Sequence, residues 1–252
     1  DKLFEIYAQI IALRPNDWFV YFMRATSYYY GENDLDAARA DLEKVITLEA
    51  DTAVPYIPAS MIALRQGRMN DAQALMREML TAYPDPSLTT RAMSALYGED
   101  SAQMSTGAFF AASTNLVLGQ YEQVITDSQP VIDSLEANPP TQEQLDQIGY
   151  EMVDVADLLL IVGLSYCNLG DYKMADMAYD YATLFSPGFE LLYLLRGQAQ
   201  QAMGDNTGAQ TSFAHARVHV LGDEFDTWVK AGIAGEWSCE NLLEYEMGGA
   251  NP

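Results

Sequence analysis

The chain has 252 residues, 49% of them apolar, which is enough to fold as one large domain or two small ones. Its 13 basic residues against 36 acidic ones give a net charge of −23, and such a negative surface disfavours nucleic acids and anionic membranes as partners. No apolar run approaches the roughly 20 residues of a membrane span. The charge is interpreted as a solvated acidic exterior, with surroundings rich in salt or divalent cations as the alternative.

Helical patterns repeat along the chain at intervals of about 34 residues, and the clearest copies lie at 159–187 and 193–216. Strand patterns of period two are absent over any useful length. The predicted units, in chain order, are a partial unit over 1–17, helix pairs over 18–52 and 53–86, a helical insert over 87–104, a third pair over 105–138, a second insert over 139–155, helix pairs over 156–189 and 190–223, and capping helices over 224–252.

Glycines and small residues mark where each helix pair turns and crosses. A glycine follows the first helix of four units, where a left-handed C-cap residue is favoured: Gly67, Gly119, Gly170 and Gly204. A small residue stands where the first helix would cross the second and lets the backbones approach: Ala25, Ser60, Ala112, Gly163 and Gly197. Near Gly31 to Asp34 the first unit has one extra residue.

The pattern resembles the tetratricopeptide repeat over about four-fifths of the chain. The Gly-Asp-Tyr turn at 170–172 and five copies in register carry this resemblance. It implies an all-α fold, a right-handed superhelix of antiparallel helix pairs, or α-solenoid. It also implies a non-catalytic protein with a protein or peptide as partner.

In this family the first helices line a concave groove that binds peptides or helices. By position, the resemblance places a mostly apolar and aromatic set of side chains on it: Phe19, Phe22, Tyr29, Tyr30, Ile57, Met61, Leu64, Phe109, Phe110, Leu116, Leu160, Leu164, Asn168 and Leu194, with Arg65, Asp157 and Gln198 also on this face. The basic clamp of the chaperone-binding members is missing. As an alternative, the aliphatic members pack between units. If the groove is open, Asp at Phe22 or Phe109 blocks partner capture without unfolding the stack.

No motif for catalysis or for a cofactor stands out, and neither an enzyme nor a metal site is predicted. Cys167 and Cys239 lie 72 residues apart without a CxxC pair or a neighbouring His, which predicts two buried thiols rather than a disulfide or a zinc site. His215 and His219, four residues apart on a helix, are interpreted as a solvated pair. Trp228 and Trp237 are expected in the core of the cap.

Three functions are compatible with these features of the sequence. The leading one is a scaffold that binds an apolar or amphipathic segment in its groove. The second is a structural subunit that self-associates or joins a larger assembly through its repeat ends, because the chain begins within a unit at Leu3. A carrier of a small hydrophobic ligand, or an enzyme, is the third. Cytoplasmic and extracytoplasmic locations both stay open.

Overall fold

The computed structural model describes residues 2–48, 53–83, 109, 111–141, 150–217 and 222–242, with the backbone alone at Tyr30, Leu80 and 150–154. These residues form helices and turns, with no strand among them. The helices in chain order are α1 (Lys2–Leu13), α2 (Trp18–Ser27), the π-helix η1 (Tyr28–Glu32), α3 (Leu35–Thr47), α4 (Tyr56–Arg65), α5 (Met69–Ala82), α8 (Tyr121–Ala137), α10 (Tyr150–Asn168), α11 (Tyr172–Phe185), α12 (Glu190–Ala202), α13 (Asn206–Ala216) and α14 (Asp223–Ile233). Residues 111–117, which precede α8, are also helical.

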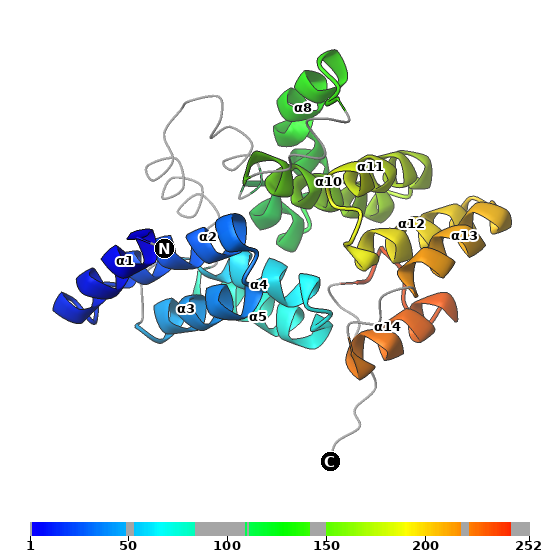
Figure 1. The fold of residues 1–252 in the computed structure, drawn as a ribbon. Coiled ribbons are helices and arrows are strands. Elements are labelled where there is room, and N and C mark those ends of the chain that lie inside the picture. The colour runs from blue at the N-terminus through cyan, green and yellow to red at the C-terminus, as the bar shows by residue number, and fades with distance from the viewer. Residues whose placement is uncertain are drawn as a thin grey trace.

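Neighbouring helices pack in pairs, and the pairs follow one another along a curved path from α1 to α14 (Figure 1). Helix α2 packs against α3, α4 against α5, α10 against α11 and α12 against α13. Contacts of α3 with α4 and of α11 with α12 join one pair to the next. The all-α solenoid of helix pairs is therefore confirmed. Its repeat boundaries stay a prediction, and the insert expected over 87–104 lies outside the described residues.

The turns within the pairs have the backbone that the glycines predict. All four glycines have a positive φ, between 70° and 81°: Gly67, Gly119, Gly170 and Gly204. Two of these turns continue directly into an aspartate that begins the second helix. The Asp171 carboxylate accepts a hydrogen bond from the Met174 amide at 3.2 Å, and Asp205 accepts one from Gly208 at 2.9 Å. The sequence Gly-Asp thus ends one helix and starts the next.

The extra residue of the first unit is accommodated in η1, the one-turn π-helix that extends α2. A π-helical turn holds one residue more than an α-helical turn. At its end Asn33 takes the left-handed conformation, with φ of 51°, that glycine has in the other turns. Asparagine is one of the few residues that adopts this region without a large penalty.

Small residues allow the two helices of a pair to come into close contact where they cross, both in the pair α10–α11 and in the pair α12–α13. A Cβ atom at Gly163 in α10 would lie 2.4 Å from the ring of Tyr179 in α11. At Gly197 in α12 it would lie 2.4 Å from the ring of Phe213 in α13. Neither distance leaves room for a methyl group, so the expectation from the sequence is confirmed at both crossings.

The part of the C-terminal cap that the structure describes consists of α14 and the turns after it, and the helix pair expected over 224–252 stays a prediction. Trp228 of α14 and Trp237 are 0% and 2% exposed, which confirms both as core residues. After α14, however, residues 234–242 form turns, and Gly235 has a φ of 76°. These turns bring Trp237 back to the core. There its indole Nε1 donates a hydrogen bond to the Trp228 carbonyl at 2.9 Å.

The close crossing generates a prediction for Gly163→Ala. An alanine favours a helix by about 1 kcal/mol over glycine. Here the added methyl would overlap the buried Tyr179 ring, so we expect a net loss of about 1–3 kcal/mol in the free energy of unfolding, measured with urea. Gly188→Ala is the matched control, because no atom lies within 4 Å of a Cβ there. Equal stability of the two variants would contradict the crossing geometry.

Candidate functional site

Most side chains predicted to line the concave groove are buried. Ten of them are at most 6% exposed: Phe22, Tyr29, Ile57, Met61, Leu64, Phe109, Leu116, Leu160, Leu164 and Leu194. Phe19 is 40% exposed and Asn168 is partly buried. Phe110 and the side chain of Tyr30 lie outside the described residues. Burial of the aliphatic members agrees with the alternative that they pack between units, and the groove itself stays a prediction.

The burial of Phe22 and Phe109 corrects one expectation from the sequence. They are 1% and 2% exposed, so an aspartate at either position would bring a charge into the core. An unpaired buried charge is strongly destabilising. These two substitutions would unfold the stack instead of blocking a partner selectively.

The helix faces that were predicted to line the groove are called the inner face below. A small apolar cavity remains where these faces meet. Its volume is about 20 Å³, and six predicted groove residues line it: Ile57, Met61, Leu64, Leu116, Leu160 and Leu164. Leu242, from beyond α14, lines it as well. A water molecule occupies a comparable volume, so this cavity has no room for a peptide.

A buried ion pair connects the first, second and fourth predicted repeats. Arg65 Nη2, at the end of α4, lies 2.5 Å from Asp157 Oδ1 in α10. The Tyr29 hydroxyl of η1 donates to Asp157 Oδ2 at 2.9 Å. The Arg65 guanidinium also lies over the Phe189 ring, 4.7 Å from its centroid, and donates to the Ser186 hydroxyl at 3.2 Å. Segments up to 128 positions apart in sequence are thus joined on the inner face.

Burial and the partner charge act in opposite directions on this pair. Burial raises the pKa of the Asp157 carboxyl, and Arg65 and the Tyr29 hydroxyl oppose that rise. Burial lowers the pKa of Arg65, but Asp157 outweighs it, and the pKa of the guanidinium rises. The short contact between the two charges makes the ionised pair the state that fits the geometry. With its charges satisfied inside the stack, the pair is a structural link.

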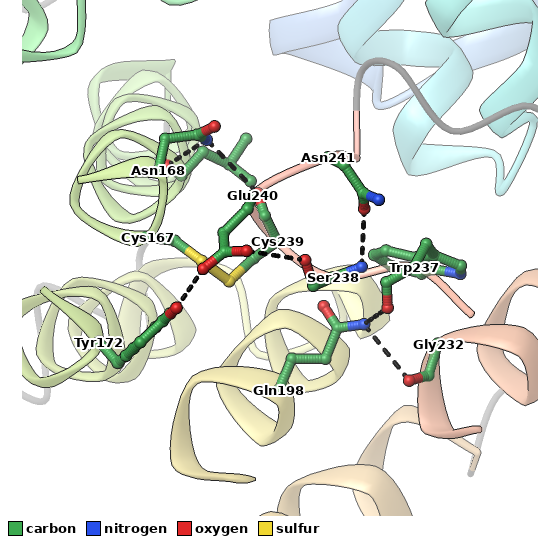
Figure 2. Close-up of a disulfide and its surroundings, with 11 residues drawn as sticks. Cys167, Asn168, Tyr172, Gln198, Gly232, Trp237, Ser238, Cys239, Glu240 and Asn241 are labelled. Carbon is green, nitrogen blue, oxygen red and sulfur yellow. Dashed lines mark hydrogen bonds between the residues drawn. A yellow bond between two sulfur atoms is a disulfide. The ribbon is translucent and has the colours of Figure 1, made fainter. Parts of the chain in front are cut away.

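The segment after α14 runs in turns against three helices, α5, α10 and α12 (Figure 2). Side-chain amides from these helices donate to its main-chain carbonyls. Gln198 Nε2 of α12 donates to Trp237 O at 2.9 Å, and Gln73 Nε2 of α5 donates to Leu242 O at 2.7 Å. Asn168 Nδ2 of α10 makes a longer contact of 3.5 Å with Cys239 O. The family resemblance placed Asn168 and Gln198 on this face, but no sequence pattern indicated that the chain's own segment contacts them.

Side chains of the same segment make further contacts with α11 and with one another. The Tyr172 hydroxyl of α11 donates to Glu240 Oε1, and Ser238 N donates to Asn241 Oδ1 at 2.8 Å. Both interactions are visible in Figure 2. The second closes the turn at 238–241, where Asn241 N also donates to Ser238 O at 3.1 Å.

A disulfide between Cys167 and Cys239 attaches this segment to α10 (Figure 2). The expectation of two buried thiols is therefore wrong about the bond, although both residues are buried, at 0% and 2% exposed. Their Cα atoms lie 6.0 Å apart, within the usual range for a disulfide. The spacing of 72 residues contained no sign of the pairing, because the return of the chain after α14 is what brings Cys239 to α10.

The disulfide accounts for much of the stability of this arrangement. Burying Leu242 contributes about 2 kcal/mol, and the hydrogen bonds from Gln73 and Asn168 about 1 kcal/mol each. Ordering the backbone of residues 238–242 costs about 5–10 kcal/mol. In the unfolded chain the disulfide closes a loop of 72 residues, which contributes about 4 kcal/mol to the free energy of unfolding.

We therefore expect Cys239→Ala to lower the free energy of unfolding by about 2–4 kcal/mol. A dithiol reductant should destabilise the unsubstituted protein by a similar amount and leave the variant unchanged. Urea unfolding with and without reductant measures both effects. Equal stability of the oxidised protein and the variant would show that the bond contributes nothing.

Beside the segment is a cleft of about 490 Å³. Its apolar wall includes Met76, Leu116, Val117, Leu164 and Leu242. Polar and charged groups also line it, among them Gln73, Arg77, Asn168 and Glu240. Pockets of this size hold small ligands or a few residues of a peptide. The apolar surface can cover apolar side chains, and the side-chain amides can donate to main-chain carbonyls. Together these groups are suited to binding a polypeptide segment.

Residues 20–52, which cover α2 from Val20 on, η1 and α3, match the family model of the tetratricopeptide repeat. The chain contains a tetratricopeptide repeat. This match confirms the resemblance that the sequence indicated. No curated protein matches the chain in sequence.

Structures of MamA and of YrrB are among the solved structures that match this chain. A structure of MamA is 17% identical, over 88% of this chain and 96% of that one, with a TM-score of 0.36. YrrB, described as a TPR protein with an unusual peptide-binding site, is 15% identical, over 89% and 97%, with a TM-score of 0.38. MamA from Desulfovibrio magneticus RS-1 is 12% identical, over 79% and 92%, with a TM-score of 0.35.

Neither a metal site nor a membrane helix is present in the part of the chain that the structure describes. No three side chains of His, Cys, Asp or Glu come together there as a metal site would require. His215 stacks on Tyr193, with ring centroids 5.0 Å apart, and His219 lies outside the described residues. Within those residues, none of the helices combines the length and the apolar character needed to cross a bilayer.

Proposed function

We propose that the chain is a non-catalytic, protein-binding scaffold that takes an extended apolar or amphipathic segment in the cleft beside residues 239–242. The observation that carries this proposal is the way the inner face already holds residues 237–242. Amides of Gln73 and Gln198 donate to main-chain carbonyls there. Every polypeptide has such carbonyls, so these donors suit an extended chain of almost any sequence.

The walls of the cleft indicate which side chains the partner would present. Met76, Val117 and Leu164 offer apolar surface, which an aliphatic or aromatic side chain would cover. Arg77 and Glu240 offer one charge of each sign at the same cleft. The net charge of −23 over the whole chain favours a basic partner in the approach to this site.

Val117→Glu tests the proposal. Val117 is partly buried and lines the cleft, so a glutamate there would place a charge where the partner's apolar side chain binds. We expect the unsubstituted chain to select peptides from a displayed library of random 12-residue sequences. Val117→Glu should weaken binding of a selected peptide about tenfold or more, measured by fluorescence anisotropy.

Met177→Glu is the matched control, because Met177 lies on α11 and is 52% exposed. It should bind the selected peptide as the unsubstituted chain does, and all three proteins should melt at similar temperatures. Selection should be carried out on the oxidised and on the reduced chain. The proposal fails if no peptide is selected in either state, or if Val117→Glu binds as well as the control.

Self-association through a repeat end is a second candidate function, and α1 favours it. None of the residues of α1 is buried, and Leu3, Ile6 and Leu13 are 43%, 45% and 84% exposed. Exposed apolar side chains along one helix are typical of a surface that another unit covers.

For this candidate we expect sedimentation velocity to show dimers or larger species at high protein concentration. Leu13→Lys should return the chain to a monomer, because a charge would replace an apolar contact. Leu184→Lys on α11, where Leu184 is 48% exposed, is the control and should leave assembly unchanged. A monomer at every concentration and salt would argue against self-association.

A further inference from the structure

We propose that residues 238–242 are an intramolecular plug of the inner face, that the Cys167–Cys239 disulfide holds them there, and that reduction of this disulfide releases them and opens the face to an extended peptide. The proposal rests on the proposed function, since it concerns what regulates the same site. It makes the affinity for a partner depend on the redox state of one bond.

Trp237, the residue immediately before the plug, anchors the chain to the core of the cap. Its side chain is 2% exposed, and its indole donates to the Trp228 carbonyl at 2.9 Å. Its ring also contacts that of Trp228, with centroids 5.2 Å apart. These contacts do not involve the disulfide. Release would therefore start after Trp237 and leave the cap of the stack in place.

The plug itself has few contacts besides the disulfide. Leu242 is buried, and its carbonyl accepts the hydrogen bond from Gln73. The contact of Asn168 with Cys239 O is long, at 3.5 Å, and the bond from Tyr172 to Glu240 is exposed to water. Because these contacts must order five residues, the covalent bond decides whether the plug stays docked.

Leu242 is the part of the plug whose removal would change the site most. It lines both the cavity of about 20 Å³ and the cleft of about 490 Å³. Without it, the two spaces would join, and apolar side chains that line only the cavity, such as Leu64, Ile161 and Leu191, would face the cleft. Gln73 would lose its acceptor at Leu242 and could donate to a carbonyl of the incoming peptide.

Cys239 forms part of the cleft lining, but it is 2% exposed and Cys167 is 0% exposed, so a reductant reaches the S–S bond when the segment moves away from the inner face. A thiolate of a dithiol reductant attacks Cys239 Sγ, the S–S bond breaks, and Cys167 leaves as a thiolate that takes up a proton. The second thiol of the reductant then attacks its own sulfur in the mixed disulfide and releases Cys239 as a thiol. Two electrons and two protons pass to the protein, and the reductant becomes a cyclic disulfide.

The chemistry of the plug defines the partner that would replace it. The peptide would have main-chain carbonyls that accept from Gln73 and Asn168, and an apolar side chain at the place of Leu242. An additional apolar residue could cover the surface that the joined cavity exposes. This is the same class of ligand as in the proposed function, with a longer stretch of contact.

Proteolysis with a glutamate-specific protease tests plug release without any partner. The bond after Glu240 lies inside the plug, so cleavage there requires the segment to leave the inner face. We expect cleavage at this bond, followed by mass spectrometry, to be about tenfold faster or more after reduction of the full chain. The variant carrying both Cys167→Ser and Cys239→Ser should be cleaved at the fast rate with and without reductant.

A second variant keeps the disulfide and removes the apolar anchor. Leu242→Ser should be cleaved after Glu240 faster than the unsubstituted oxidised chain, while Leu184→Ser on the outside of α11 should not. Circular dichroism should show the same helix content in every sample. If reduction leaves the rate of cleavage after Glu240 unchanged, the plug is overturned.

The selected peptide provides the second readout. We expect it to bind the reduced chain at least about tenfold more tightly than the oxidised chain, and the double Cys→Ser variant as tightly as the reduced chain. Equal affinity in both redox states overturns the plug and leaves the proposed function intact. Binding in neither state overturns the proposed function, and the plug with it.

Discussion

The paired helices approach so closely at Gly163 and Gly197 that no further carbon atom fits between them. This constraint fixes the geometry within these two helix pairs. It also determines which side chains lie on the inner face of α10 and α12. Asp157, Asn168 and Gln198 belong to that face, and each contacts a residue far away in the chain. The positions of the side chains on the inner face of α10 and α12 therefore depend on these two helix crossings.

The local structure could largely be predicted from the sequence. The four glycines end first helices in the left-handed conformation, and the small residues mark real crossings at Gly163 and Gly197. These features depend on a few neighbouring residues and on the helical period, which a single sequence records. The extra residue near Gly31 was also evident, although its accommodation in a π-helix was not.

The inner face could not be predicted in the same way. Its contacts join residues that are far apart in the chain, such as Tyr29 with Asp157, and no short pattern records such a pairing. The family resemblance correctly placed Asn168 and Gln198 on this face. It could not indicate that residues 237–242 of the same chain would lie against them. For the same reason the spacing of Cys167 and Cys239 suggested two thiols, whereas the fold brings them together.

The contact between Tyr29 and Asp157 has a consequence for how the stack unfolds. In a simple solenoid each repeat contacts only its neighbours, and repeats can open one after another from an end. Here the first predicted repeat is bonded to the fourth through Asp157, which also binds Arg65 of the second. Opening the second or the fourth unit leaves one charge of this pair buried without its partner, and opening the first removes the hydrogen bond from Tyr29. Cooperativity should thus extend across non-adjacent repeats, so that η1, α4 and α10 unfold together.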